Sequence, residues 1–183
     1  MAARHMMIDF ETLGTSPDTA VLSVGVVLFT VQETLAEKEW FFQVHDQLRA
    51  KSSVNFDTVT WWLGQESKAK AIFDKCKLEG FLMPAFVADF EGLLLAQDPN
   101  KELRVWGNGA TFDVTIAENI FLRAGRPVPW KYFNVRCYRT LKTMQDIERG
   151  ISRLGTKHCA IEDARFQAKC VQEFLKKNPG ADK

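Results

Sequence analysis

With 183 residues the chain is long enough to bury a sizeable core, and we expect a single domain over residues 1–183. Its 46% hydrophobic and 26% charged residues are ordinary for a soluble globular protein. A net charge of +1 argues against the broad basic surface of a protein that coats duplex nucleic acid. It leaves room for an enzyme that grips the end of a strand.

The cysteines and the N-terminus give an expectation about the compartment. The four cysteines form no CxxC pair, which favours reduced thiols in a cytoplasmic protein over a disulfide framework or a zinc site. No signal peptide and no run long enough to span a membrane is present, so we expect no membrane association. Residues 1–6, MAARHM, could be a cloning remnant ahead of Met7.

The first predicted strand, residues 6–11, contains two acidic side chains. Because strand side chains alternate, Asp9 and Glu11 point to one face while Ile8 and Phe10 point to the other. Two neighbouring carboxylates repel each other, and neither loses its water cheaply. Either this strand edge is wet, or a cation lies between the two groups.

Two further strands and two helical regions follow. Residues 19–31 are rich in β-branched side chains, and residues 35–45 alternate well enough to form a neighbouring strand. Three strands with short connections predict an antiparallel meander. Residues 58–76 and 83–97 carry apolar side chains at helical spacing.

The second half of the chain alternates between strands and helices. We expect a strand at 103–109, a helix at 111–125, a strand at 131–137 and helices at 138–150 and 162–178. A meander followed by such alternation predicts an α/β domain with a mixed central sheet.

The stretch WGNGATFD connects a strand to a helix. A dinucleotide-binding fingerprint would need a third glycine where Phe112 stands, so that interpretation fails. Taken alone, Asp113 is better explained as a first-turn carboxylate stabilised by the helix dipole.

The stretch HCAIEDA leads into the last helix. His158 on the preceding loop and Asp163 in the first turn could both face one site. A nucleophilic pair of Cys159 with His158 is disfavoured, because adjacent residues do not usually face one another. The other histidines have weaker cases: His5 falls in the possible remnant, and His45 ends a strand on a solvated edge.

The tryptophan pair Trp61-Trp62 lies in a predicted helix. Adjacent helical positions diverge by about 100°, so only one ring can comfortably face the core. The other ring is a candidate platform for stacking on a nucleic-acid base.

Taken in order, these motifs resemble one family. Asp9-x-Glu11, Phe112-Asp113 and His158-x4-Asp163 resemble the DEDDh branch of the DnaQ-like 3′–5′ exonucleases, from Met7 to about residue 175. TVTWWLGQ and VWGNGATFD look closest to a bacterial and phage branch described variously as exoribonuclease or exodeoxyribonuclease. No catalytic position departs from the family pattern, which disfavours an inactive copy.

The resemblance implies a fold and a mechanism. It implies a ribonuclease H-like fold in which Asp9, Glu11, Asp113 and Asp163 hold two divalent cations, Mg²⁺ or Mn²⁺, roughly 3.5–4 Å apart. His158 would act as general base, since its ordinary pKa of about 6.5 lies near working pH. The enzyme would release nucleoside 5′-monophosphates from the 3′ ends of single-stranded RNA or DNA. Its relatives are often homodimers.

Substrate contacts are expected around this site. The resemblance maps contacts with the terminal nucleotide to the backbone after the acidic pair, with an apolar wedge there. The candidates are Thr12 and Leu13 for these contacts, Trp62 and Phe112 for stacking, and Gln65 and Asn108 for polar contacts. A packing or turn role is the alternative for each.

Two other functions stay open at this point. One is a nucleic-acid-binding module that kept the fold and lost the chemistry, and the other is a ribonuclease H-like endonuclease, for which His158 is a less natural partner. Nothing in the sequence decides between RNA and DNA, because one well-placed group suffices to read the 2′-hydroxyl.

Overall fold

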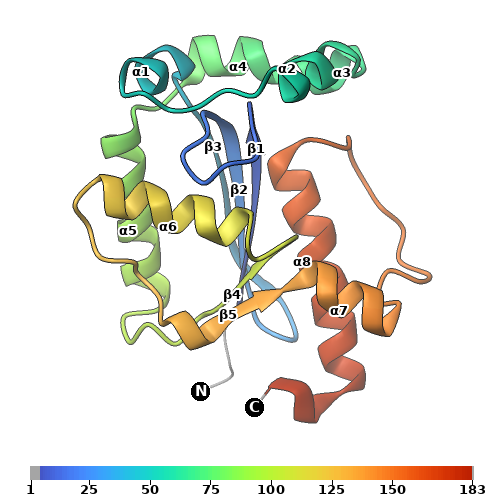
Figure 1. The fold of residues 1–183 in the computed structure, drawn as a ribbon. Helices are drawn as coiled ribbons and strands as arrows, with labels where there is room; N and C mark the ends of the chain where they lie inside the picture. Colours follow the sequence, from blue (N-terminus) through green and yellow to red (C-terminus); the bar gives the residue numbers. More distant parts are fainter. Residues whose placement is uncertain (1–4, 183) are drawn as a thin grey trace.

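The computed structural model describes residues 5–182 and is built around a five-stranded sheet (Figure 1). The strands are β1 (His5–Thr12), β2 (Val21–Phe29), β3 (Thr34–Phe41), β4 (Arg104–Gly107) and β5 (Val135–Cys137). Their order in the sheet is β3-β2-β1-β4-β5. β1, β2 and β3 pair antiparallel, whereas β4 and β5 join parallel to β1. The predicted meander and mixed sheet are thereby confirmed.

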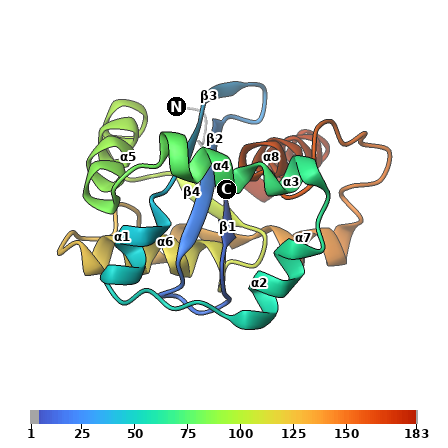
Figure 2. The same cartoon turned by 90° about the horizontal axis from the view of Figure 1, so that it is seen from above.

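Helices cover both faces of the sheet. On one face lie α5 (Met83–Gln97) and α6 (Asp113–Arg123), and on the other lie α7 (Tyr138–Gln145) and α8 (Ala160–Lys177). Figure 2 shows the sheet between α5 and α8. Every residue of β1 and β2 is buried because both faces of these central strands are covered.

The alternation of β1 divides its side chains between two cores. Met6, Ile8 and Phe10 pack with residues of α5 and α6, while Met7 packs with residues of α8. The register of β1 therefore decides which face receives its two carboxylates.

Four short helices lie over one end of the sheet. They are α1 (Val44–Arg49), α2 (Phe56–Leu63), α3 (Ser67–Lys70) and α4 (Ile72–Glu79). The helix predicted over residues 58–76 is thus broken. Gly64 ends α2, and Glu66 adopts an extended conformation before the next turn begins.

Three further expectations need correction. The strand predicted to reach His45 ends at Phe41, and His45 lies exposed in α1. The helix predicted to close at Gly150 ends earlier, because Asp146 takes a left-handed φ of 47°. The strand predicted at 131–137 is shorter, because Tyr132–Asn134 form a 3₁₀ turn and β5 begins only at Val135. A second 3₁₀ turn lies at Pro179–Asp182.

The beginning of β1 bears on the suggested cloning remnant. His5 and Met6 are buried in β1, and the Nδ1 atom of His5 accepts a hydrogen bond from the Nε1 of Trp106 at 3.1 Å. Both residues therefore belong to the folded sheet, while residues 1–4 lie outside the described part of the chain. Within residues 5–182, no helix is long and apolar enough to cross a membrane.

Candidate active site

Asp9 and Glu11 share the α8 side of β1, as the alternation predicts. Each is only 8% exposed, because β1 is a central strand covered on both faces. The Oδ1 of Asp9 accepts a hydrogen bond from the Nε2 of Gln167 on α8 at 2.7 Å. The two carboxylates therefore lie side by side, largely shielded from water, and Gln167 on α8 donates a hydrogen bond to one of them.

Asp113 approaches the same strand from α6. β4 ends at Gly107, opposite Ile8, so the next amide of β1 on that side, Phe10 N, has no strand partner. The Oδ1 of Asp113 accepts this amide hydrogen at 3.0 Å. Gly107 makes the approach possible, because a Cβ there would lie 2.9 Å from the Cβ of Asp113.

The start of α8 brings Asp163 to the site. Gly25 of β2 lies opposite Asp9, and a Cβ at Gly25 would meet the backbone of Ala160 and Ile161 at 2.4 Å. A side chain at this position is therefore excluded, and the first turn of α8 rests directly on the sheet. Asp163, in that turn, is buried next to the carboxylates of β1.

His158 lies on the loop just before α8. Its backbone has a left-handed φ of 62°, which is uncommon outside glycine, and its amide donates to the Oδ2 of Asp163 at 3.2 Å. Its ring lies nearly perpendicular to the ring of Trp61, with centroids 4.8 Å apart. The imidazole is thus held between α2 and α8.

The electrostatics of the three sheet-side carboxylates are unfavourable without a cation. Burial, followed by the charges of Asp113 and Glu11, raises the pKa of Asp9 well above its usual range. Burial and the charges of Asp113 and Glu39 raise the pKa of Glu11 to about 8. Burial raises the pKa of Asp113 to about 7, against the opposing effect of its backbone hydrogen bonds.

His158 is shifted in the opposite direction. Burial, then the nearby charges of Arg153 and Lys157, lower its pKa below the ordinary histidine value. The imidazole is therefore neutral at pH 7 and has a nitrogen able to accept a proton.

The donor set suits a hard divalent cation. Glu11, His158 and Asp163 each offer a ligand atom within 4.8 Å of the other two. Asp9 and Asp113 interact electrostatically with the same group. Carboxylate oxygens are the ligands that Mg²⁺ and Mn²⁺ prefer. The residues present therefore fit divalent metal ions.

The tryptophan pair divides as expected, but with the roles exchanged. Trp62, our candidate for stacking, is 1% exposed, and its Nε1 donates to the backbone oxygen of Thr12 at 2.9 Å. Its ring cannot stack on a base without leaving the core. Trp61 is 43% exposed and lies against His158, so the exposed platform is Trp61.

The residues after the acidic pair are more enclosed than the resemblance implies. Leu13 is buried in the apolar cluster beneath α2 and α4, so its side chain is not an exposed wedge. Thr12 is buried too, and its Oγ1 donates to the oxygen of Gly14 at 2.6 Å. The backbone of this turn is bonded as well, because Asn55 N donates to the oxygen of Leu13 and Leu13 N donates to that of Ala20, both at 2.8 Å.

The other candidate contacts are half-buried. Phe112 packs against the α5–α6 core next to Asp113. The Nε2 of Gln65 donates to the backbone oxygen of Trp61 at 3.1 Å. Asn108 lies in the turn after β4, where its backbone oxygen accepts a hydrogen bond from Arg139 at 2.7 Å.

Sequence reasoning missed three neighbours of the site. Gln167 could have been found, because it follows Asp163 by four residues and so shares its helix face. Trp61 required knowing which face of α2 is buried. Arg153, whose guanidinium pairs with Asp163 and lies 5.0 Å from the ring of Phe166, has no signal in the sequence.

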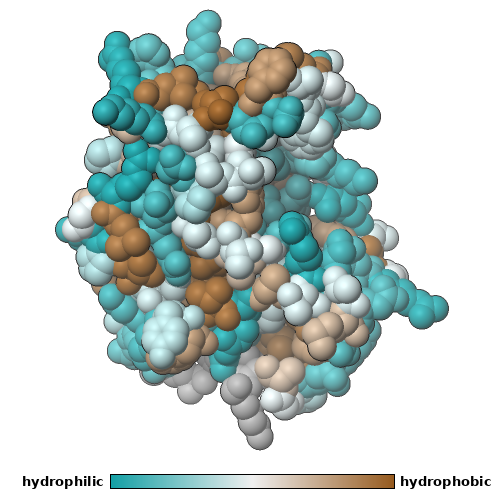
Figure 3. Space-filling view, viewed as in Figure 1, coloured by the Kyte–Doolittle hydropathy of each residue, from teal (hydrophilic) through white to brown (hydrophobic). Residues whose placement is uncertain are grey.

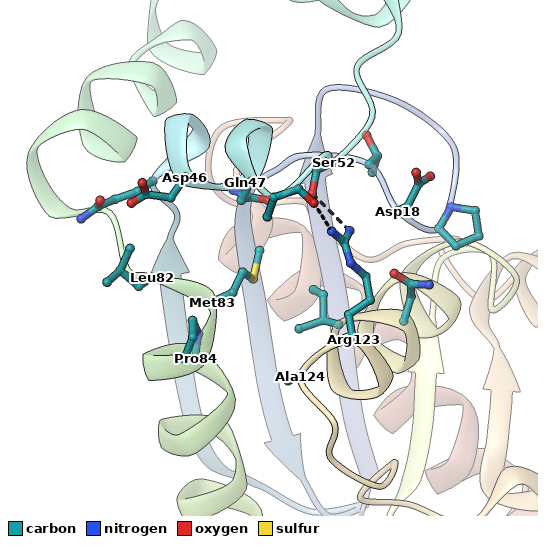
Figure 4. A pocket seen from close by; sticks show the side chains of 15 residues that line it. Asp18, Asp46, Gln47, Ser52, Leu82, Met83, Pro84, Arg123 and Ala124 are labelled. Carbon is teal, nitrogen blue, oxygen red and sulfur yellow. Dashed lines mark hydrogen bonds between the residues drawn. The ribbon is translucent and has the colours of Figure 1, made fainter.

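A well-formed cavity lies away from these residues. It measures about 270 Å³ and is enclosed by α1, α5, α6 and the loop after β1 (Figure 4). Arg123 spans it, donating to the backbone oxygen of Ala50 at 2.7 Å and to the Oγ of Ser52 at 3.3 Å. None of the acidic site residues lines this cavity. The candidate active site is therefore the group of carboxylates and not this cavity.

Comparison with known families and proteins gives one match by sequence. A family model described as the 3′–5′ exoribonuclease Rv2179c-like domain matches residues 4–175. No curated protein matches the chain.

Solved nuclease structures share the fold. The nuclease domain of 3′hExo, a DEDDh family member bound to rAMP, has a TM-score of 0.65 at 13% identity, over 97% of this chain and 94% of that one. Cell-death related nuclease 4 has a TM-score of 0.64 at 10% identity, over 97% and 65%. E. coli exonuclease I in complex with a 5cy-dT13 oligonucleotide has 0.65 at 14% identity, over 98% and 41%. The predicted ribonuclease H-like fold is confirmed, and the chain spans less than half of exonuclease I.

Proposed function

Since the chain belongs to the family of Rv2179c-like 3′–5′ exoribonuclease domains, we propose that this 3′–5′ exonuclease hydrolyses single-stranded RNA to nucleoside 5′-monophosphates. The observation that carries the proposal is the convergence of four buried carboxylates and a histidine at one end of the sheet. The rAMP bound to the 3′hExo nuclease domain and the oligonucleotide bound to exonuclease I support a single-stranded substrate. The proposed catalytic residues are Asp9, Glu11, Asp113, His158 and Asp163.

The four carboxylates would hold two divalent cations, Mg²⁺ or Mn²⁺. Asp9 and Glu11 lie on β1, Asp113 begins α6 and Asp163 lies in the first turn of α8. Ligand atoms of Glu11 and Asp163 lie within 4.8 Å of each other. When bound, such cations stabilise negative charge on the reacting phosphate and lower the pKa of a water molecule. The raised pKa values of the metal-free carboxyl groups mean that these residues release protons on binding a cation.

His158 is the proposed general base. Its lowered pKa keeps the imidazole neutral, and its place beside Asp163 puts it at the edge of the acidic group. It would accept a proton from the attacking water as the water oxygen bonds to phosphorus and the bond from phosphorus to the 3′ oxygen breaks. The 3′ oxygen of the shortened strand then takes up a proton from solvent.

The terminal nucleotide would lie between α2 and the turn after β4. Trp61, exposed and in contact with His158, takes the stacking role that we first gave to Trp62. Phe112 and Asn108 would border the opposite side of the site.

The test uses RNA and DNA strands of the same sequence, each labelled at the 5′ end, incubated with Mn²⁺. We expect the RNA to shorten one nucleotide at a time from its 3′ end, with 5′-monophosphates released, and D113N to abolish this. Internal fragments would indicate an endonuclease. Binding without hydrolysis would indicate a silent binding module, and equal cleavage of DNA would remove the RNA preference.

A further inference from the structure

Two aromatic rings project from the surface beside the edge strand β5. Tyr132 is 85% exposed and Phe133 is 59% exposed, in the 3₁₀ turn that precedes the strand. Their centroids are 5.3 Å apart, and the ammonium of Lys131 lies 6.0 Å from the ring of Phe133. Large adjacent rings left in water on this scale are typical of a binding surface.

All charged side chains in the stretch of sequence around these rings are basic. Residues 119–145 contain no aspartate or glutamate, although the whole chain has 24 basic and 23 acidic residues. The basic residues of this region are Arg123, Arg126, Lys131, Arg136, Arg139 and Lys142.

Half of these cations are bound to acidic side chains or to the α1 region. Arg123 binds the α1 region, Arg126 pairs with Glu91, and Lys142 pairs with Glu148. The other three, Lys131, Arg136 and Arg139, form no ion pair with an acidic side chain among residues 5–182, and Arg136 and Arg139 donate to backbone oxygens.

β5 connects this surface to the proposed active site. It pairs in parallel with β4, and Cys137 lies opposite Gly107, directly before the turn that contains Asn108. Arg139 donates to the backbone oxygen of Asn108 at 2.7 Å, which places its guanidinium at the edge of the site. The strand of three residues rises about 3.3 Å per residue, so the rings lie on the order of 10–15 Å from that turn. Figure 1 shows β5 running along the open edge of the sheet beside β4.

We propose that Lys131, Tyr132, Phe133, Arg136 and Arg139, the β5 strip, bind the substrate strand on the 5′ side of the nucleotide that is removed. This inference rests on the proposed 3′–5′ activity. Bases stack on the two rings while the cations neutralise phosphates, which is how proteins hold single strands without reading sequence. Figure 3 shows apolar side chains exposed on this face of the molecule, among hydrophilic ones.

Charge favours a nucleic acid over a second copy of the chain as the occupant. In a two-fold symmetric contact the same patch meets itself, so the β5 strip would place cations against cations. A polyanion removes this repulsion. A strand that ends within the active site would also reach the strip only if it is longer than a few nucleotides.

The double variant Y132S/F133S tests the strip. In the inactive D113N background, we measure the binding of a 5′-fluorescein-labelled oligoadenylate RNA dodecamer by fluorescence anisotropy. Loss of stacking on two bases should raise Kd by about tenfold or more. In the active background, hydrolysis of an RNA dinucleotide should not change. L95S, which alters an exposed apolar residue on α5, is the matched control and should change neither quantity.

A charge variant supplies an independent measurement. With K131Q, the slope of log Kd against log salt for the dodecamer should fall by about 0.7, the value for one phosphate contact on a single strand. An unchanged slope would remove Lys131 from the strip.

Other outcomes overturn the inference in distinct ways. An unchanged dodecamer Kd in Y132S/F133S rejects the strip as a strand-binding surface. If sedimentation shows that this variant turns a dimer into a monomer at unchanged affinity, the rings form a dimer interface. If the unaltered protein hydrolyses no strand with Mn²⁺, the proposed function fails, while the anisotropy result still decides whether the strip binds RNA.

Discussion

The two sides of the proposed active site are built in different ways. On the sheet side, Asp9, Glu11 and Asp113 are fixed by the pairing of β1 and by a hydrogen bond from the strand backbone. On the loop side, His158 and Asp163 follow an irregular segment, and His158 has a left-handed backbone. One side is positioned by the sheet, and the other by how a loop meets the first turn of α8.

The two sides also carry different kinds of strain. The sheet side is rigid and carries electrostatic strain, since burial and mutual repulsion raise the pKa of its carboxyl groups. The loop side carries conformational strain at a non-glycine residue with positive φ. Strain of both kinds concentrates at functional sites, which supports the proposal that the active site lies here. The experiments that follow would break or sharpen it.

The largest effect should come from removing the base on the loop side. H158A should lower kcat by about 10²–10⁴-fold, because no other group takes the proton from the attacking water. Calorimetry with Mn²⁺ should show metal binding largely retained, since the carboxylates are unaltered. Lost Mn²⁺ binding would make His158 a ligand instead.

The next largest effect should come from removing a buried side chain that supports the sheet side of the site. W62A removes a buried ring that donates to the Thr12 backbone, and should cost about 3–5 kcal/mol of unfolding free energy. W61A is the matched control. It should change stability little, but should weaken strand binding by about 1–3 kcal/mol. If both variants lose stability equally, the assignment of inner and outer rings is wrong.

The contact between β2 and the first turn of α8, where the two sides of the site meet, can be disturbed by one substitution. G25A would place a Cβ against the backbone of Ala160 and Ile161, and should destabilise the fold by about 1–3 kcal/mol while lowering activity. G92A, in the middle of α5 with open space around it, should instead stabilise by about 0.5–1 kcal/mol. Thermal unfolding of both variants measures the contrast, and similar Tm values would contradict it.

A further prediction concerns the pH dependence of the metal-free protein. The folded-state pKa values of Glu11 and Asp113, about 8 and about 7, lie above their ordinary values of 4.5 and 3.8. The stability from these groups is therefore fully present below pH 4 and is lost as pH rises through 7 and 8. We expect Tm to fall over this range without metal, less steeply in D113N. Saturating Mn²⁺ should reverse this fall in Tm. If the difference in Tm between the metal-free unaltered protein and metal-free D113N did not change with pH, the proposed repulsion between the carboxylates would be contradicted.

The sequence predicted the sheet side well because its signals are local. Alternation placed Asp9 and Glu11 on one face, and the glycine-rich turn placed Asp113 at a helix start. The boundaries of α2 and α7 were predicted less well. Gly64 and Asp146 end these helices early, and tertiary packing decides such breaks more than helical periodicity does.

The loop side and the aromatic contacts could not be read in the same way. The divergence of adjacent helical positions indicated that Trp61 and Trp62 differ in exposure. Which of the two rings is buried depends on where α2 lies on the sheet. Arg153 reaches Asp163 across a loop without periodic pattern, so no spacing rule could connect the two.

One amide of β1 is placed where it can report on the whole site. Because β4 stops at Gly107, the amide of Phe10, which lies between Asp9 and Glu11 in the chain, donates its hydrogen bond to Asp113 instead of to a neighbouring strand. Any cation that draws Asp113 away, or any proton that Asp113 takes up, changes the acceptor of that single bond. The nitrogen-15 resonance of Phe10 should therefore follow occupancy of the site in a titration, with no label on the substrate and no turnover.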